Sequence, residues 1–268
     1  MTPRTPAGPP EGFEAVESRG ALAWVRPEAR SWVVGALDRS GSLYRDARTV
    51  AGGEAVLHGR APVFVIPSGA TPSGTTPSGN THWVVRHYMR GGSIATVLGD
   101  RYVRVGRPRP FVETTASESL RGLGIATPRV LAAAVYPSGA VYRGDLVTER
   151  IEGSRDLGEL LFGSGDRAAP EVRVAALHAA GRLVRTLAAA EVHHRDMNVK
   201  NVLVEFEAMP LRLHLLDLDR CRLEARPQRW TKWWMRRRLL RSVATWERKT
   251  GRALTPDERE ALTAGLAG

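Results

Sequence analysis

The stretch HRDMNVKN, residues 194–201, places an aspartate and an asparagine five positions apart, and LLDLDR, residues 215–220, supplies a second aspartate after an apolar run. Phosphoryl transfer uses such groups: a carboxylate accepts the acceptor's hydroxyl proton, while an amide oxygen and a second carboxylate hold Mg²⁺ on the nucleotide phosphates. The spacing fits the H-R-D-x-x-x-x-N catalytic loop. Capping and turn hydrogen bonds alone explain one or two of these residues, but not Asp196, Asn201 and Asp217 together.

The chain on the N-terminal side of this loop is predicted to be rich in strands. Short apolar runs separated by turns predict a five-stranded sheet with one helix over residues 13–151, preceded by a loose tail at 1–12. A TPSG repeat within residues 68–80 predicts an exposed loop. The expected strands are 51–59, 62–67, 81–88, 129–136 and 140–151, and the expected helix is 111–123.

The C-terminal part shows helical periodicity instead. Apolar residues recur at steps of three and four from residue 171, which predicts a helix with one apolar face that leads into His193 and His194. A strand pair at 202–206 and 211–218 and a basic helix at 228–250 follow. The order of a β-rich part and a helical part predicts an α+β fold with two lobes, divided at 13–151 and 152–268.

The composition excludes several classes of protein. The 268 residues are 43% hydrophobic and carry a net charge of +11, which is too apolar for a disordered chain. A single cysteine, Cys221, excludes a disulfide framework and a four-cysteine zinc site. No apolar run is long enough for a membrane span, and the N-terminus does not read as a secretory signal. We therefore expect a soluble protein in a reducing, intracellular compartment.

Three strings carry a family resemblance: WVVRHYMRGG at 83–92, DLVTERIEG at 145–153, and HRDMNVKN with LLDLDR. The chain resembles the lipopolysaccharide kinases of the protein-kinase-like superfamily, most closely the Kdo (3-deoxy-D-manno-octulosonic acid) kinases, over residues 50–225. The resemblance implies a reduced two-lobed kinase with an antiparallel β-sheet N-lobe and a mostly helical C-lobe. It also implies ATP and Mg²⁺ as cofactors and a Kdo sugar of a lipid A precursor as acceptor.

The resemblance also assigns roles to single residues. It makes Asp196 the catalytic base, Asn201 and Asp217 the metal ligands, and residues 148–151, with Glu149 and Ile151, the hinge that receives adenine. Acceptor specificity lies in the shape of the binding pocket. A kinase of another lipopolysaccharide core sugar or small molecule therefore stays open, as does a catalytically silent kinase-like module that binds membranes.

The upstream nucleotide-binding elements are less clear in the sequence. Gly52 and Gly53 fit a turn that covers phosphates, although any hairpin could hold two glycines. Arg86 stands where kinases of this superfamily carry a lysine, and it can grip phosphate bidentately unless it is an ordinary strand residue facing solvent. We expect Glu113 to pair with Arg86, with Glu118 as the alternative.

Nothing after Asp219 resembles a long activation segment or an A-P-E string, so the sequence favours a small-molecule or glycolipid acceptor over a protein. Residues 226–252 hold ten basic residues, one acid and four of the seven tryptophans. The apolar stripe of this segment can pack on the C-terminal lobe, and its basic face can lie on an anionic membrane. We expect no nucleic-acid partner, because no nucleic-acid-binding signature accompanies the charge. The expected location is the cytoplasmic face of the inner membrane.

Overall fold

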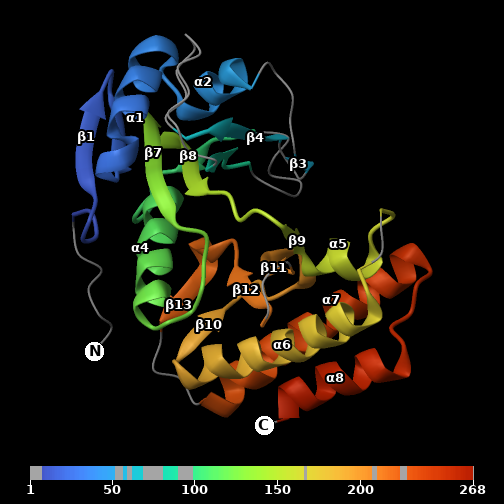
Figure 1. The fold of residues 1–268 in the computed structure, drawn as a ribbon. Helices are drawn as coiled ribbons and strands as arrows, with labels where there is room; N and C mark the ends of the chain where they lie inside the picture. Colours follow the sequence, from blue (N-terminus) through green and yellow to red (C-terminus); the bar gives the residue numbers. More distant parts are fainter. Residues whose placement is uncertain are drawn as a thin grey trace. The chain divides into compact units, whose positions relative to one another are not determined.

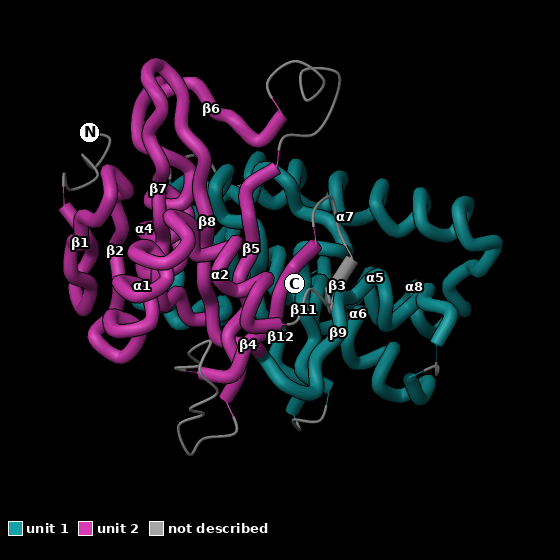
Figure 2. The backbone as a smooth tube through the Cα atoms, turned by 90° about the horizontal axis from the view of Figure 1, so that it is seen from above, with its two compact units in different colours: residues 1–2, 119–128, 151–268 teal, residues 3–118, 129–150 magenta. Residues whose placement is uncertain are grey.

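The computed structural model describes residues 8–51, 57–58, 62–68, 81–89, 99–165, 168–206, 210–223 and 228–267. The chain forms two compact units, which Figure 2 shows in different colours. The sheet unit consists of Pro3–Glu118 and Arg129–Arg150, and the helical unit of Ser119–Pro128 and Ile151–Gly268, together with the first two residues. The predicted boundaries, 1–12, 13–151 and 152–268, stay predictions.

The sheet unit is built on an antiparallel sheet in the order β1-β2-β7-β8-β5-β4-β3, with β6 paired to β8. The hairpin of β7 and β8 lies at its centre, because β2 pairs with β7 and β5 pairs with β8. Its tight turn contains Gly139 at φ 59°, a backbone conformation that glycine adopts without steric cost. The strands are β1 (Glu14–Ser18), β2 (Ala21–Val25), β3 (Leu57–His58), β4 (Pro62–Pro67), β5 (His82–His87), β6 (Tyr102–Val103), β7 (Val130–Ser138) and β8 (Val141–Glu149).

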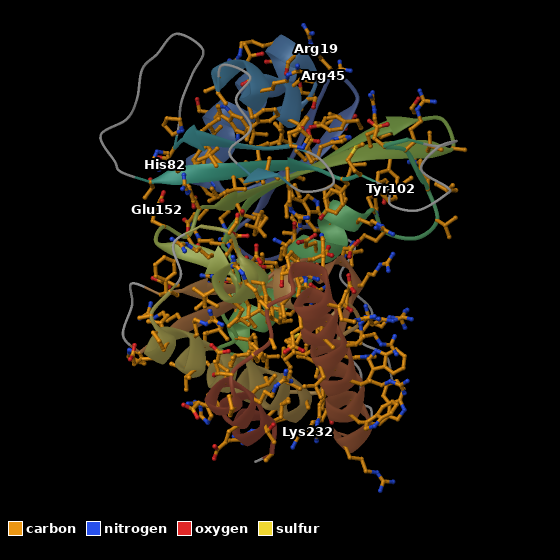
Figure 3. All side chains as sticks on the ribbon, turned by 90° about the vertical axis from the view of Figure 1, so that its right-hand side faces the viewer. Arg19, Arg45, His82, Tyr102, Glu152 and Lys232 are labelled. Carbon is orange, nitrogen blue, oxygen red and sulfur yellow. The ribbon has the colours of Figure 1, made fainter. Side chains whose placement is uncertain are left out.

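Helices cover both faces of this sheet: α1 (Pro27–Ser40) and α2 (Leu43–Val50) on one, and α4 (Arg109–Gly122) on the other (Figure 1). Alternate β7 residues enter the two cores, so that Ala132 and Ala134 face the first and Ala133 the second. In the second core Trp24 of β2 stacks on Phe111 of α4. Tyr102 of β6, labelled in Figure 3, stacks on Tyr142 of β8.

The prediction of an α+β chain is confirmed, but the prediction of one helix and five strands before residue 151 is wrong. The described residues there form three helices and eight strands. Helix α1 begins with Pro27 at its first turn and ends at Gly41, which has φ 67°. Helix α2 follows at once, because the Ser42 side chain accepts a hydrogen bond from the backbone N–H of Arg45.

The helical unit holds two small sheets and four helices in the described part of the chain. One sheet has the order β12-β11-β9, and the other pairs β10 with β13. Its strands are β9 (Ser154–Asp156), β10 (Val192–His194), β11 (Val202–Glu205), β12 (Arg212–Leu215) and β13 (Cys221–Leu223). Its helices are α5 (Leu157–Phe162), α6 (Pro170–Ala189), α7 (Gln228–Thr250) and α8 (Pro256–Ala267). None of the described helices is long and apolar enough to cross a membrane.

Helix α6 is the centre of this unit and packs against both α7 and α8. Arg173 of α6 and Glu258 of α8 form a buried ion pair, with Nε donating to Oε1 over 2.7 Å. Near the other end of α8 the two backbones meet, since a Cβ atom on Gly181 would lie 2.6 Å from the carbonyl carbon of Gly265. Helix α6 leads into β10, which positions the loop of residues 195–201.

Candidate active site

The loop of residues 195–201 follows β10 and is held to the segment after β12 by two hydrogen bonds. The buried His194 makes a hydrogen bond of 3.0 Å from its Nε2 to the carbonyl oxygen of Leu216. The backbone N–H of Leu216 in turn donates to the carbonyl oxygen of Asn201 at 2.9 Å. The two contacts bring Asn201 and the residue before Asp217 side by side.

Two asparagines shape the loop from inside. The side-chain amides of Asn198 and Asn201 donate to the main-chain carbonyl of Asp196, at 2.8 Å and 2.9 Å. Asn198 also accepts a hydrogen bond from the backbone N–H of Lys200, which caps a 3₁₀ turn at Val199–Asn201. Since the amide nitrogen of Asn201 is used in this way, its Oδ1 is the atom that can bind a cation.

Asp217 adopts a left-handed backbone conformation, with φ 58° and ψ 61°. Such a conformation costs about 1 kcal/mol or more for a residue other than glycine, and it is concentrated at functional sites. Asp217 and the Oδ1 of Asn201 are hard oxygen donors that fit Mg²⁺, which takes one or two protein ligands and completes its shell with phosphates and water.

The side chain of Asp196 has a partner that the sequence analysis did not foresee. Nη2 of Arg238, on α7, donates to Asp196 Oδ1. One helical turn further on, Ser242 Oγ accepts the backbone N–H of Val199 at 3.2 Å. Helix α7 therefore holds the loop at both its carboxylate and its backbone. The 42 residues that separate Arg238 from Asp196 leave no local pattern that could have indicated the pair.

In the sheet unit, Arg86 of β5 forms an ion pair with Glu113 of α4. The hydroxyl of Tyr88 donates to the other carboxylate oxygen of Glu113, and the Arg86 guanidinium lies 5.0 Å from the Tyr88 ring centroid. Glu113 is buried, so its charge is held by these two partners. Glu118, the alternative partner, pairs instead with Arg26 at 2.7 Å. The predicted role of Arg86 and Glu113 in nucleotide binding stays a prediction.

Next to Arg86, His87 takes part in a buried polar network centred on Asp145 of β8. Its Nδ1 lies 2.5 Å from Asp145 Oδ1, and its Nε2 lies 3.1 Å from Asp100 Oδ2. Tyr136 and Ser42 donate their hydroxyls to Asp145 Oδ2, at 2.6 Å and 2.9 Å. Burial lowers the pKa of His87, but the hydrogen bonds and charges of Asp145 and Asp100 outweigh it, so the pKa lies above its usual value.

Several polar groups of the expected adenine hinge already have hydrogen-bond partners within the protein. The backbone N–H groups of Glu149 and Arg150 donate to the carbonyls of Arg129 and His82, each at 2.9 Å. The Glu149 carboxylate pairs with Arg129, also at 2.9 Å. The carbonyl of Ile151, where the helical unit resumes, accepts from Ser154 Oγ at 2.5 Å. A nucleotide base therefore cannot use the N–H of Glu149 without breaking the sheet.

Several predictions lie largely outside the described residues: the loose tail at 1–12, the strand at 51–59 with its phosphate-covering turn at Gly52 and Gly53, and the TPSG loop. In the part of the chain that the structure describes, no three His, Cys, Asp or Glu side chains lie together as ligands for a metal ion.

Comparison with known proteins gives a family match over most of the chain. Residues 68–265 match the sequence model of the lipopolysaccharide kinase (Kdo/WaaP) family. A 3-deoxy-D-manno-octulosonic acid kinase of Vibrio cholerae is 30% identical over 53% of this chain and 57% of its own length. One of Stenotrophomonas maltophilia is 35% identical over 60% of this chain and 61% of its own length. The chain thus matches about three fifths of the length of each of these curated relatives.

A solved structure shares the fold. The chain described as "WaaP in complex with acyl carrier protein" superposes with a TM-score of 0.50 and 18% identity, over 94% of this chain and 88% of that one. This likeness concerns the fold alone, and it confirms the prediction of a kinase-like architecture.

Proposed function

The chain belongs to the lipopolysaccharide kinase (Kdo/WaaP) family, and on this basis we propose that it is an ATP- and Mg²⁺-dependent kinase of a Kdo sugar. The acceptor would be a hydroxyl of Kdo on a lipid A precursor. The observation that carries the proposal is a pair of hydrogen bonds made by Asn201. Its side-chain amide donates to the main-chain carbonyl of Asp196, and its main-chain carbonyl accepts from the backbone N–H of Leu216, the residue before Asp217. This arrangement supports the proposal because the segment before Asp217 is hydrogen-bonded to the loop that carries Asp196 and Asn201, the residues proposed as base and metal ligand.

The proposed chemistry assigns one step to Asp196. The acceptor hydroxyl oxygen forms a bond to the γ-phosphorus, the bond from that phosphorus to the β–γ bridging oxygen breaks, and ADP leaves. The hydroxyl proton passes to Asp196, whose Oδ2 is the available oxygen because Arg238 binds Oδ1. Bound Mg²⁺ would neutralise charge on the phosphates, held by Asn201 Oδ1 and the Asp217 carboxylate.

The nucleotide would be held by residues of the sheet unit. We assign the α- and β-phosphates to Arg86, whose planar guanidinium suits bidentate phosphate binding and is oriented by buried Glu113. The glycines Gly52 and Gly53 would supply backbone N–H groups to the phosphates. Adenine would bind at Glu149 to Ile151, using groups other than the N–H of Glu149.

The location of such an acceptor suggests a peripheral protein at the cytoplasmic face of the inner membrane. Helix α7 buries Met235, Leu239 and Val243, which belong to the apolar stripe predicted for this segment. The opposite face of α7 exposes Trp233 and Leu240 beside several arginines. Tryptophan and arginine on one exposed face fit the interface of an anionic membrane. Lys232, in the first turns of the same helix, is labelled in Figure 3.

The proposal is tested by incubating the protein with ATP, Mg²⁺ and Kdo–lipid A and measuring the acceptor by mass spectrometry. We expect a mass gain of one phosphate, lost by at least about a hundredfold in Asp196→Asn because proton transfer to the base typically contributes this much. Asp257→Asn is the matched control, since Asp257 is exposed in the first turn of α8. Full activity of Asp196→Asn would refute the assignment.

The same assay addresses the alternatives. Transfer to another core sugar, but not to Kdo, would move the protein to a different acceptor within the family. No transfer to any sugar, together with no thermal stabilisation by millimolar ATP and Mg²⁺, would identify a silent kinase-like module instead.

A further inference from the structure

Arg238 stands apart from the other basic residues of α7. Arg236, Arg237 and Arg241 are exposed, whereas Arg238 is half-buried and directs Nη2 to Asp196. Its neighbour Leu239 is fully buried on the face of α7 that packs into the helical unit. Arg238 and Ser242 thus lie one turn apart along the side of α7 that meets the loop of residues 195–201.

The hydrogen-bonding capacity of Arg238 is only partly used. A guanidinium has five N–H donors, and Arg238 has one hydrogen bond to Asp196. Its Nε is buried and, among the described residues, finds no hydrogen-bond acceptor. The side chain is nevertheless 36% exposed, so a molecule that reaches Asp196 also reaches Arg238. Because Nε is buried, the N–H groups on the two Nη atoms are the donors that such a molecule can use.

The proposed reaction changes the net charge of the pair formed by Asp196 and Arg238. When Asp196 takes up the hydroxyl proton it loses its charge, and Arg238 is left without a counter-ion. An anionic group on the acceptor would restore the balance from the same side as the hydroxyl. A carboxylate suits the fork of an arginine best, because two parallel N–H donors can bind its two oxygens.

We propose that Arg238 is a binding residue for a carboxylate of the acceptor sugar, so that the site selects a sugar acid over a neutral sugar. This inference rests on the proposed function and deepens it. The curated relatives are named as kinases of a sugar acid, which is the chemical class that Arg238 would recognise. Selectivity then comes from the residue that also orients the base.

The test compares a Kdo glycoside with its carboxyl methyl ester, which keeps the hydroxyls and removes the charge. Binding is measured by calorimetry in the presence of ADP, with the wild type, Arg238→Gln and Arg238→Lys. We expect the wild type to bind the acid roughly tenfold or more tighter than the ester, since hydrogen bonds to charged groups contribute this much. Arg238→Gln should bind both sugars alike, and Arg238→Lys should lie between. Arg241→Gln, one turn away and exposed, is the matched control and should keep the preference of the wild type.

Kinetics separate this role from two others. Loss of carboxylate binding raises KM for the acid selectively and leaves KM for ATP unchanged. If Arg238→Gln lowers kcat for acid and ester equally, Arg238 only positions Asp196 and the inference is wrong. If KM for ATP rises instead, the anion that Arg238 binds is the γ-phosphate, and the inference is again wrong.

The kinase assignment and the carboxylate site can be refuted separately. A wild type that binds the acid over the ester but transfers phosphate to no sugar would refute the kinase assignment and keep the carboxylate site. A wild type that phosphorylates acid and ester equally well, with equal affinity, would refute the carboxylate site and keep the kinase. Circular dichroism of both Arg238 variants shows whether a loss of binding reflects unfolding, and Arg238→Lys retains the charge if Arg238→Gln does not fold.

Discussion

Glu113 and Glu118 lie on the same helix, five residues apart, and bind different arginines. Glu113 binds Arg86 and the hydroxyl of Tyr88, while Glu118 binds Arg26. The sequence favoured Glu113 for its position near the start of the helix, but a helical face alone could not decide between them. The choice depends on tertiary contacts, because Arg86 lies 27 residues from Glu113 and Arg26 lies 92 residues from Glu118, and no local pattern reports either pair.

The two glutamates therefore offer a matched pair of substitutions. Glu113→Gln removes the charge that orients Arg86, so we expect KM for ATP to rise roughly tenfold, as when one charge-assisted hydrogen bond is lost. Glu118→Gln makes the same change at the Arg26 pair and should leave KM for ATP unaltered. Steady-state kinetics at saturating acceptor measures both. Equal effects of the two variants would show that Arg86 has no special role in nucleotide binding.

His87 makes the stability of the folded chain depend on pH. Burial lowers its pKa, but Asp145 and Asp100 raise it further, so the folded-state pKa exceeds the ordinary value of 6.5. Its neighbours also include the ring of Tyr44, and Arg143 reaches Asp100 at 3.9 Å. The folded state therefore holds the proton more tightly than the unfolded state. The resulting stabilisation is fully present below the unfolded-state pKa and is lost as the pH rises through the folded-state pKa.

Urea unfolding between about pH 6 and about pH 9 measures this dependence. The wild type should lose unfolding free energy with rising pH, and His87→Gln should lose less over the same interval. His178→Gln is the control, because His178 is exposed on α6. An identical pH dependence in the wild type and His87→Gln would contradict the prediction.

Among the elements, the long helices were the most predictable. The basic helix was expected at 228–250 and spans Gln228–Thr250, because its apolar residues keep helical spacing over many turns. Helix α1 was missed although its signal is present: Ala29, Trp32, Val33, Ala36 and Leu37 are all buried and recur at steps of three and four. Its paired valines favour a strand locally, and the burial of one helical face overrides that preference.

The contact of α6 with α8 shows an interaction that sequence patterns cannot reveal. Gly181 and Gly265 bring two helix backbones together, and a Cβ on Gly181 would lie 2.6–2.8 Å from backbone atoms of α8. Nothing in the sequence distinguishes these glycines from ordinary weak points of a helix.

We expect Gly181→Ala to destabilise the protein by about 1–3 kcal/mol, because backbone atoms cannot move aside as a flexible side chain can. Without the contact, alanine in a helix should stabilise by up to about 1 kcal/mol. Gly122→Ala, at the end of α4 with no atom within 4 Å of the added Cβ, is the control and should be neutral or stabilising. Chemical denaturation of both variants gives the comparison. Equal unfolding free energies for the two variants would mean that α8 moves freely relative to α6.

For the molecule as a whole, the net charge of +11 is concentrated in one segment. Residues 226–252 carry most of it, and the structure divides their roles. Arg238 faces the loop of residues 195–201, whereas Arg236 and Arg237 are exposed, with the Arg237 guanidinium 5.3 Å from the ring centroid of Trp233. One helix thus serves the candidate site with one side and offers a cationic, aromatic surface with the other. The charge of the segment can be counted from the sequence, but the division of its arginines between two sides of α7 cannot.

The exposed side of α7 is expected to bind anionic bilayers. In sedimentation with vesicles, the full chain should bind phosphatidylglycerol-containing vesicles but not pure phosphatidylcholine, and binding should weaken as salt screens the charges. Each basic residue near such a surface contributes about 1 kcal/mol, so Arg236→Gln with Arg237→Gln should weaken binding roughly tenfold or more. Arg45→Gln with Arg48→Gln is the control, because it removes the same charge from exposed positions on α2. If both pairs weaken binding equally, the vesicles sense net charge alone, and the tryptophan-bearing face of α7 is not the surface that meets the membrane.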